Sequence, residues 1–318
     1  MNLNYPKPTE SIETAKTDLK KWGYCLLKNA IPPDLNSRAM ERLIEQANAE
    51  KELNLAYEDG SEKKKWGEFN KNTDAPGVNQ RVWMLPNKGK VFLDILAKHN
   101  YVDCVKEIVG DEFLVSSFGA NIAKPGGMRM DLHTDQWWAP EPTRPGRRNL
   151  PVGSMTRKKF DCDLEFTEKK ASIAPAACSN VIFMMNDFTE ANGGTRLVPG
   201  SHMFGRHPDA VEDKDIETVA AEGNEGTALI TDGRVWHGTG ANITNENRIA
   251  MLLTFCGPQY RPQVNFPMAI DKEILKSASD RQKAMFGLKI WWGYGRTGNP
   301  NLDFINPEEK ALGKLTLN

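Results

Sequence analysis

The stretch NRIAMLLTF, residues 247–255, is a largely apolar run of the kind typical of a buried strand. Similar short segments recur from about residue 113 onward and are separated by Gly, Pro and Asn. They are FLVSSFGANIA, MDLHTDQWW, SNVIFMMNDF, TRLVPG, GTALIT and RVWHGTG. Many short strands at modest spacing predict a β-sandwich or barrel, such as a jelly roll.

Helices are expected around this core. Apolar residues recur at helical spacing in residues 9–22, 34–52, 90–109 and 271–289, and a short strand, GYCLLKN, lies between the first two segments. We therefore predict a mainly β protein with peripheral α-helices, organised as a single domain over residues 1–318. Its expected parts are a helical N-terminal part over about 1–110, a jelly-roll core over about 111–260 and a C-terminal helical extension over about 261–318.

Residues 139–179 form a segment that is too long and irregular for a hairpin turn. Structureless loops longer than about 12–15 residues are usually functional lids or disordered segments, so we expect a lid-like insertion here. Residues 144–159 within it hold six basic and no acidic side chains. Folded over an active site, they would favour an anionic substrate, whereas a solvated run of charges is the alternative interpretation.

The overall composition excludes several classes of function. The formal net charge of the 318 residues is −1, so there is no general attraction to nucleic acid. We find no apolar run of 18 residues and expect no membrane span. The N-terminal residues lack the apolar stretch of a signal peptide, and the five cysteines form no C-x-x-C motif. Reduced thiols of this kind indicate a cytoplasmic protein.

A candidate metal site lies in LHTDQ, residues 132–136. In a strand, His133 and Asp135 would point to the same face because residues i and i+2 do so. His237, in the β-like segment RVWHGTG, would complete a set of two histidines and one carboxylate, which holds Fe(II) and leaves positions open for O₂ and a co-substrate. Two alternatives remain: H-x-D is a common tripeptide beside a core histidine, and Zn²⁺ accepts the same ligands.

Arg248 lies 11 residues after His237 and within the apolar strand. A guanidinium in a largely buried strand needs an anionic partner, and arginine suits a two-point grip on a carboxylate. The far carboxylate of 2-oxoglutarate, an organic acid that can chelate iron, would provide that partner. The alternative is a surface arginine paired with Glu246 or another acid.

Three motifs, LHTDQ (132–136), NGGTRLVPGSH (192–202) and HGTGANITNENR (237–248), resemble the phytanoyl-CoA dioxygenase family. Its members are Fe(II)- and 2-oxoglutarate-dependent oxygenases with a double-stranded β-helix, the jelly-roll core shared with cupins. The resemblance covers roughly residues 15–260. It implies these roles: His133, Asp135 and His237 as iron ligands, and Arg248, Thr239 and Thr195 as contacts of 2-oxoglutarate. Some members carry Gln where this chain has Met130, and related halogenases lack a carboxylate at the position of Asp135.

The resemblance implies an enzyme that uses Fe(II), 2-oxoglutarate and O₂ to oxidise an unactivated C–H bond of a small molecule, with release of succinate and CO₂. We expect hydroxylation, desaturation or oxidative cyclisation in secondary metabolism. The alternatives are an acyl-CoA hydroxylase of the same family and a metal-dependent hydrolase or isomerase on a cupin-like fold. A homodimer is also expected, because relatives often close their pockets with a partner chain.

Substrate contacts are the least defined part of the site. Trp137 and Trp138 follow the H-x-D motif and are candidates for the pocket wall, with plain core packing as the alternative. The segment NQRVWMLPNKGKVF, residues 79–92, resembles a family segment near the pocket mouth, which makes Gln80 and Trp83 candidate contacts. Arg296, near the C-terminus, is a further candidate for the same cavity.

Overall fold

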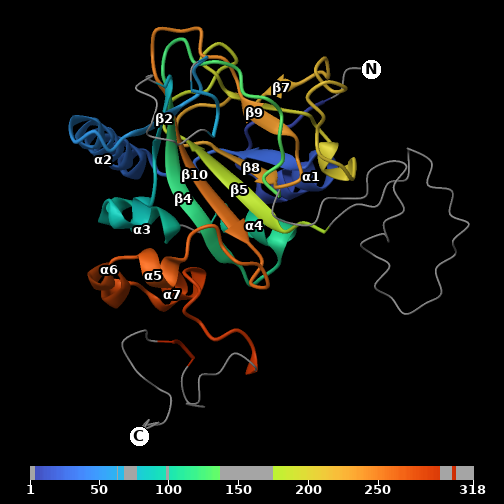
Figure 1. Cartoon of the computed structure of the whole chain (residues 1–318). Helices are drawn as coiled ribbons and strands as arrows, with labels where there is room; N and C mark the ends of the chain where they lie inside the picture. Colours follow the sequence, from blue (N-terminus) through green and yellow to red (C-terminus); the bar gives the residue numbers. More distant parts are fainter. Residues whose placement is uncertain are drawn as a thin grey trace, which may run out of the picture.

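Two antiparallel sheets form the centre of the computed structural model, which describes residues 4–62, 64–67, 77–97, 100–136, 175–293 and 303–305 (Figure 1). The major sheet has the order β1 (Tyr24–Leu27), β8 (Ala228–Asp232), β5 (Cys178–Met184), β10 (Arg248–Cys256), β4 (Leu114–Ala123), β3 (Asn79–Val82) and β2 (Tyr57–Asp59). The minor sheet has the order β7 (Val219–Ala220), β6 (Thr195–Leu197) and β9 (His237–Thr239). The predicted jelly-roll fold is confirmed.

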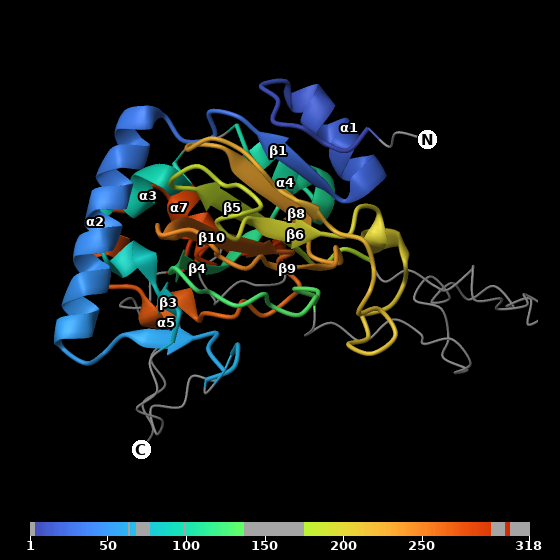
Figure 2. The same cartoon turned by 90° about the horizontal axis from the view of Figure 1, so that it is seen from above.

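Seven α-helices lie around the sheets in the described part of the chain. They are α1 (Ile12–Trp22), α2 (Pro33–Glu52), α3 (Lys90–Leu96), α4 (Val102–Val109), α5 (Phe266–Ala269), α6 (Lys272–Ser277) and α7 (Asp280–Met285). Figure 2 shows α1 beside β1 and α2 alongside α3. In Figure 1, α5, α6 and α7 gather below the major sheet. None of the described helices is long and apolar enough to cross a membrane.

The major sheet separates two layers of buried side chains, because alternate residues of a strand face opposite sides. On β10, Met251, Leu253 and Phe255 belong to the larger core, which the helices cover. Ala250 packs in a second core together with Leu197 of the minor sheet. Residues of β10 with even numbers, including Arg248, therefore face the space between the two sheets.

Two of the predicted helices are wrong in extent. The segment 90–109 is divided into α3 and α4, and the side chain of Asn100 accepts a hydrogen bond from the Tyr101 N–H just before α4 begins. The segment 271–289 is divided into α6 and α7, because Ser279 and Gln282 form a capping box that starts a new helix. Side-chain hydrogen bonds thus start new helices within segments that the apolar spacing alone would read as one helix.

The N-terminal part, expected to be mainly helical, also supplies three strands of the major sheet. Only β1 was predicted, as GYCLLKN; β2 and β3 were not. Both are short, and β3 pairs with the long strand β4, so they depend on pairing for their conformation. Most of the expected insertion, residues 139–174, lies outside the described residues, whereas Cys178 already begins β5. The single domain over residues 1–318 stays a prediction.

Candidate active site

His133 and His237 lie opposite each other in a short antiparallel bridge. The His133 N–H donates to the His237 carbonyl at 2.9 Å, and the His237 N–H donates back to the His133 carbonyl at 3.0 Å. A Cβ at Gly238 would lie 2.9 Å from the Met130 carbonyl oxygen, so only glycine allows this close approach. The backbone thereby brings together two imidazoles that are 104 residues apart in the chain, with ring centroids 4.4 Å apart.

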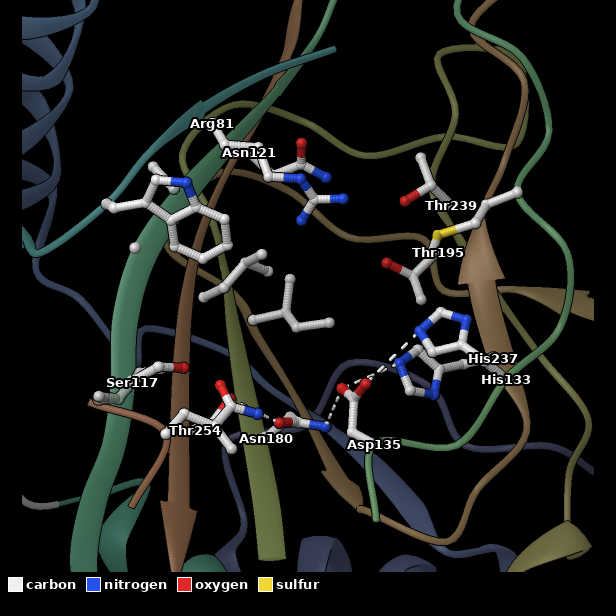
Figure 3. A pocket seen from close by; sticks show the side chains of 18 of the residues that line it. Arg81, Ser117, Asn121, His133, Asp135, Asn180, Thr195, His237, Thr239 and Thr254 are labelled. Carbon is white, nitrogen blue, oxygen red and sulfur yellow. Dashed lines mark hydrogen bonds and ion pairs between the residues drawn. The ribbon is translucent and has the colours of Figure 1, made fainter. Parts of the chain in front are cut away.

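Asp135 completes the triad in Figure 3. Its Oδ1 lies 3.5 Å from Nε2 of His133, and its Oδ2 lies 3.3 Å from Nε2 of His237. The ligand atoms of all three residues lie within 4.8 Å of one another. The segment that carries His133 and Asp135 is not a strand of either sheet, since His133 forms an isolated bridge and Asp135 lies at a bend. The two side chains nevertheless converge as expected.

Hydrogen bonds determine which ring nitrogens face the centre of the triad. Nδ1 of His133 lies 3.2 Å from the Asp131 carbonyl, and Nδ1 of His237 lies 2.9 Å from the Val235 carbonyl. A carbonyl only accepts, so both Nδ1 atoms donate, and each neutral ring presents the lone pair of Nε2 to the carboxylate. Three acceptors therefore converge on one point, which is the donor set that a divalent metal ion requires.

The charges agree with a cation-binding centre. Burial opposes ionisation of Asp135, yet the imidazoles of His237 and His133 hold the pKa of its carboxyl well below the ordinary value. Burial would lower the pKa of His237, but the Asp135 carboxylate outweighs it and raises that pKa. The carboxylate is thus ionised and favours positive charge beside it.

Arg248 reaches the same cavity from the start of β10 and is only 1% exposed. Its Cζ lies 4.9 Å from the ring centroid of Phe188. Its Nε and Nη2 atoms have no hydrogen-bond partner among the described residues, and no described ion pair joins it to Glu246. Burial, and then the charge of Arg81, lower the pKa of Arg248 to about 10. A buried guanidinium without a protein partner fits the carboxylate of a bound ligand.

The other residues expected at the site differ in their placement. Thr195 and Thr239 are register partners on β6 and β9, and both line the cavity. Trp83 lines it too, whereas Gln80 faces α2 and donates a hydrogen bond to the Ala47 carbonyl at 2.8 Å. Alternate residues of β3 point to opposite faces, which is why Gln80 is not on the cavity wall. Trp137, Trp138 and Arg296 lie outside the described residues.

Several polar residues of the cavity wall were not expected from the sequence: Arg81, Ser117, Asn121, Asn180, Thr254 and Gln263. In Figure 3, Arg81 and Asn121 lie across the cavity from the two histidines. Arg81 belongs to the segment 79–92 that the sequence analysis singled out. Because neighbouring residues of a strand point to opposite faces, Arg81 could have been predicted as the cavity residue in place of Gln80. Asn180 interrupts an otherwise apolar run, SNVIFMM, which is a usable signal for a functional side chain.

Comparisons with known proteins give the same assignment. Residues 19–250 match the family model described as phytanoyl-CoA dioxygenase (PhyH). Dioxygenase af480 of Aspergillus fumigatus is 28% identical over 284 residues, which cover 88% of this chain and 78% of that protein. Dioxygenase FrzG of a Cladobotryum species is 30% identical over 224 residues, covering 67% of this chain and 65% of that protein. The match to dioxygenase FUM3 of Gibberella moniliformis, 33% identical, spans 39% of this chain and only 40% of that protein.

Solved structures share the fold. The epimerase SnoN, in complex with Fe³⁺, α-ketoglutarate and nogalamycin RO, superposes with a TM-score of 0.54 at 13% identity, over 79% of this chain and 86% of that one. HygX of Streptomyces hygroscopicus, with nickel, 2-oxoglutarate and hygromycin B bound, also has a TM-score of 0.54 at 13% identity, over 78% of this chain and 88% of that one. With the family match over residues 19–250 and the triad in one cavity, the chain belongs to the phytanoyl-CoA dioxygenase (PhyH) family and is an iron- and 2-oxoglutarate-dependent dioxygenase.

Proposed function

We propose that this dioxygenase oxidises an unactivated C–H bond of a small molecule in secondary metabolism, with His133, Asp135 and His237 as the iron ligands. Arg248 is the proposed partner of the distal carboxylate of 2-oxoglutarate. The observation that carries this assignment is the buried guanidinium of Arg248, whose Nε and Nη2 have no partner among the described residues, in the cavity that also contains the triad.

Iron, 2-oxoglutarate and O₂ together supply the oxidising power, and succinate and CO₂ are the released co-products. The protein's own residues bind and orient. The two Nδ1 hydrogen bonds hold the imidazoles with Nε2 toward the centre. The hydroxyls of Thr195 and Thr239 line the wall beside the triad and are proposed contacts of the co-substrate. The apolar cavity residues Ile182 and Leu252 keep water away from the reacting centre.

The substrate is proposed to be a small molecule, and hydroxylation, desaturation or oxidative cyclisation to be the outcome. Support comes from two solved structures with the same fold, SnoN with nogalamycin RO bound and HygX with hygromycin B bound. Trp83 is the proposed substrate contact within the described residues, because it lines the cavity and its side chain is 37% exposed, as expected at a mouth. An anionic substrate and a homodimer stay predictions from the sequence.

The decisive experiment is an anaerobic titration of the metal-free protein with Fe(II) and 2-oxoglutarate, followed by the visible metal-to-ligand charge-transfer band. The band should form in the wild type and be lost in His133→Ala, which removes a ligand. Arg248→Met should retain Fe(II) but require far more 2-oxoglutarate. Arg42→Met, a part-buried arginine on α2 that does not line the cavity, serves as the matched control.

Three results would contradict the proposal. Fe(II) binding that survives in His133→Ala would remove the triad from the metal site. Unchanged 2-oxoglutarate affinity in Arg248→Met would remove Arg248 from the co-substrate site. Metal bound without any charge-transfer band in the wild type would favour the hydrolase or isomerase alternative.

A further inference from the structure

A buried asparagine on β5 stands directly behind the carboxylate of the triad. Asn180 is 4% exposed, and its neighbours Val181 and Phe183 pack in the core under the helices, while Asn180 and Ile182 face the cavity. Asparagine is disfavoured in strands, and a buried amide without hydrogen bonds costs roughly 1–3 kcal/mol in proteins. Asn180 therefore needs hydrogen-bond partners at both ends of its amide, and those partners indicate its role.

The hydrogen bonds of Asn180 determine the orientation of its amide. Asn180 Nδ2 donates to Oδ2 of Asp135 at 2.7 Å, and Thr254 Oγ1 donates to Asn180 Oδ1 at 2.9 Å (Figure 3). An ionised carboxylate only accepts, so the amide nitrogen must face Asp135 and the amide oxygen must face the hydroxyl. Thr254 and Asn180 are register partners on β10 and β5, so the chain of hydrogen bonds starts from two central strands of the major sheet.

Asp135, in contrast, is not held by pairing between strands of a sheet. It lies at a bend two residues after His133, outside the strands of both sheets. Both Nε2 atoms present lone pairs to this carboxylate, so among the described residues Asn180 is the only one that donates a side-chain hydrogen bond to it. The donated bond also occupies a lone pair of Oδ2 and leaves Oδ1 the less engaged oxygen. The orientation of the carboxylate therefore depends on Asn180.

We propose that Asn180, oriented by Thr254, is a positioning residue that holds the Asp135 carboxylate ready for the metal ion. This inference rests on the proposed function, because it takes the triad as the metal centre. Loss of a hydrogen-bond partner behind a metal ligand typically weakens metal affinity by roughly 10–100-fold.

The test is a Co(II) titration of the metal-free protein, read by the visible d–d absorption of the bound ion, with thermal unfolding of the metal-free form as a second readout. Asn180→Ala should weaken Co(II) binding roughly 10–100-fold and alter the d–d spectrum. Thr254→Val should weaken Co(II) binding less, because the Asn180 amide remains but is no longer oriented by the Thr254 hydroxyl. Thr254→Ser, which keeps the hydroxyl, should restore wild-type binding.

Ser179→Ala is the matched control. Ser179 neighbours Asn180 on β5, is fully buried, and donates its own hydrogen bond to the Thr231 carbonyl at 3.2 Å, away from Asp135. Its loss should lower the unfolding temperature as a buried hydrogen bond does, with no change in Co(II) affinity or spectrum.

The outcomes separate the inference from the proposed function. Wild-type Co(II) affinity and spectrum in both Asn180→Ala and Thr254→Val would overturn the inference alone. Equal losses of affinity in Asn180→Ala and Ser179→Ala would also overturn it, since they would show a purely structural role. Thr254→Val leaves Asn180 in place, so the test stands even if Asn180→Ala does not fold. Undiminished Co(II) binding in His133→Ala would instead refute the metal centre, and with it both proposals.

Discussion

Arg81 and Arg248 line the same cavity, yet the protein neutralises only one of them. Nε and Nη2 of Arg81 each lie 3.2 Å from Oδ2 of Asp59, whose side chain is completely buried. Asp59 is held in turn by the amide of Asn79 at 2.6 Å and by the N–H of Gly67 at 3.0 Å. Arg248 has no such carboxylate among the described residues.

The difference separates a structural arginine from one kept for a ligand. An ion pair buried with further hydrogen bonds satisfies both charges, whereas an unpaired buried cation is a cost to folding. An unpaired buried charge is retained at a ligand-binding site, because the bound ligand neutralises it. The two side chains should therefore respond in opposite ways to the same substitution, which the following predictions use.

The largest effect is expected for the stability of Arg81→Met. Removing the cation leaves the buried carboxylate of Asp59 without its partner, which costs about 3–5 kcal/mol. Urea unfolding of the metal-free protein measures the loss. The double variant Arg81→Met/Asp59→Leu should recover part of it, because no unpaired charge remains. Unchanged stability in the single variant would mean that the pair does not hold β2 and β3 together.

Arg248→Met should show the reverse pattern. Its metal-free form should be as stable as the wild type or more stable, because a buried unpaired charge is replaced by an apolar side chain. Its affinity for 2-oxoglutarate should fall about 100-fold, equivalent to about 2.7 kcal/mol. Calorimetric titration of the Co(II)-loaded protein measures the affinity. A marked loss of stability would show that Arg248 has a structural partner after all.

A smaller effect is expected for the stabilisation of the folded protein by 2-oxoglutarate, which should depend on Arg248. At ten times its Kd, 2-oxoglutarate should stabilise the Co(II)-loaded wild type by about 1.4 kcal/mol, since it binds only the folded state. At the same concentration, Arg248→Met should gain almost nothing. Thermal unfolding with and without 2-oxoglutarate measures both. Equal gains in the two proteins would place the co-substrate carboxylate elsewhere.

The smallest effect concerns a third arginine, outside the cavity. Arg206 grips both carboxylate oxygens of Asp213 at 2.6 and 2.7 Å, and this hydrogen bonding lowers the pKa of Asp213 below 3.8. Asp213→Asn should cost up to about 1 kcal/mol at neutral pH. Because the folded-state pKa is depressed, the wild-type advantage is present above pH 3.8 and disappears as the pH falls below it. Unfolding of both proteins at pH 7 and in acid tests this, and a gap that persists in acid would contradict it.

The sequence by itself determined the chemistry of the centre and the class of the fold. H-x-D places His133 and Asp135 two residues apart, and their side chains converge although Asp135 lies at a bend. The many short apolar segments indicated the jelly roll, and the three motifs, with Arg248 11 residues after His237, indicated the likeness to a known family. These are local patterns, and local backbone geometry is enough to interpret them.

Only the tertiary structure decided which distant groups meet and which stay unpaired. The pairing of Arg81 with Asp59 and the placement of Gln80 against α2 depend on strand order and register. The hydrogen-bond chain behind Asp135 likewise exists because β10 and β5 are neighbours. Apolar spacing predicts which face of an element is buried, but the partners across that face are set by how the elements pack.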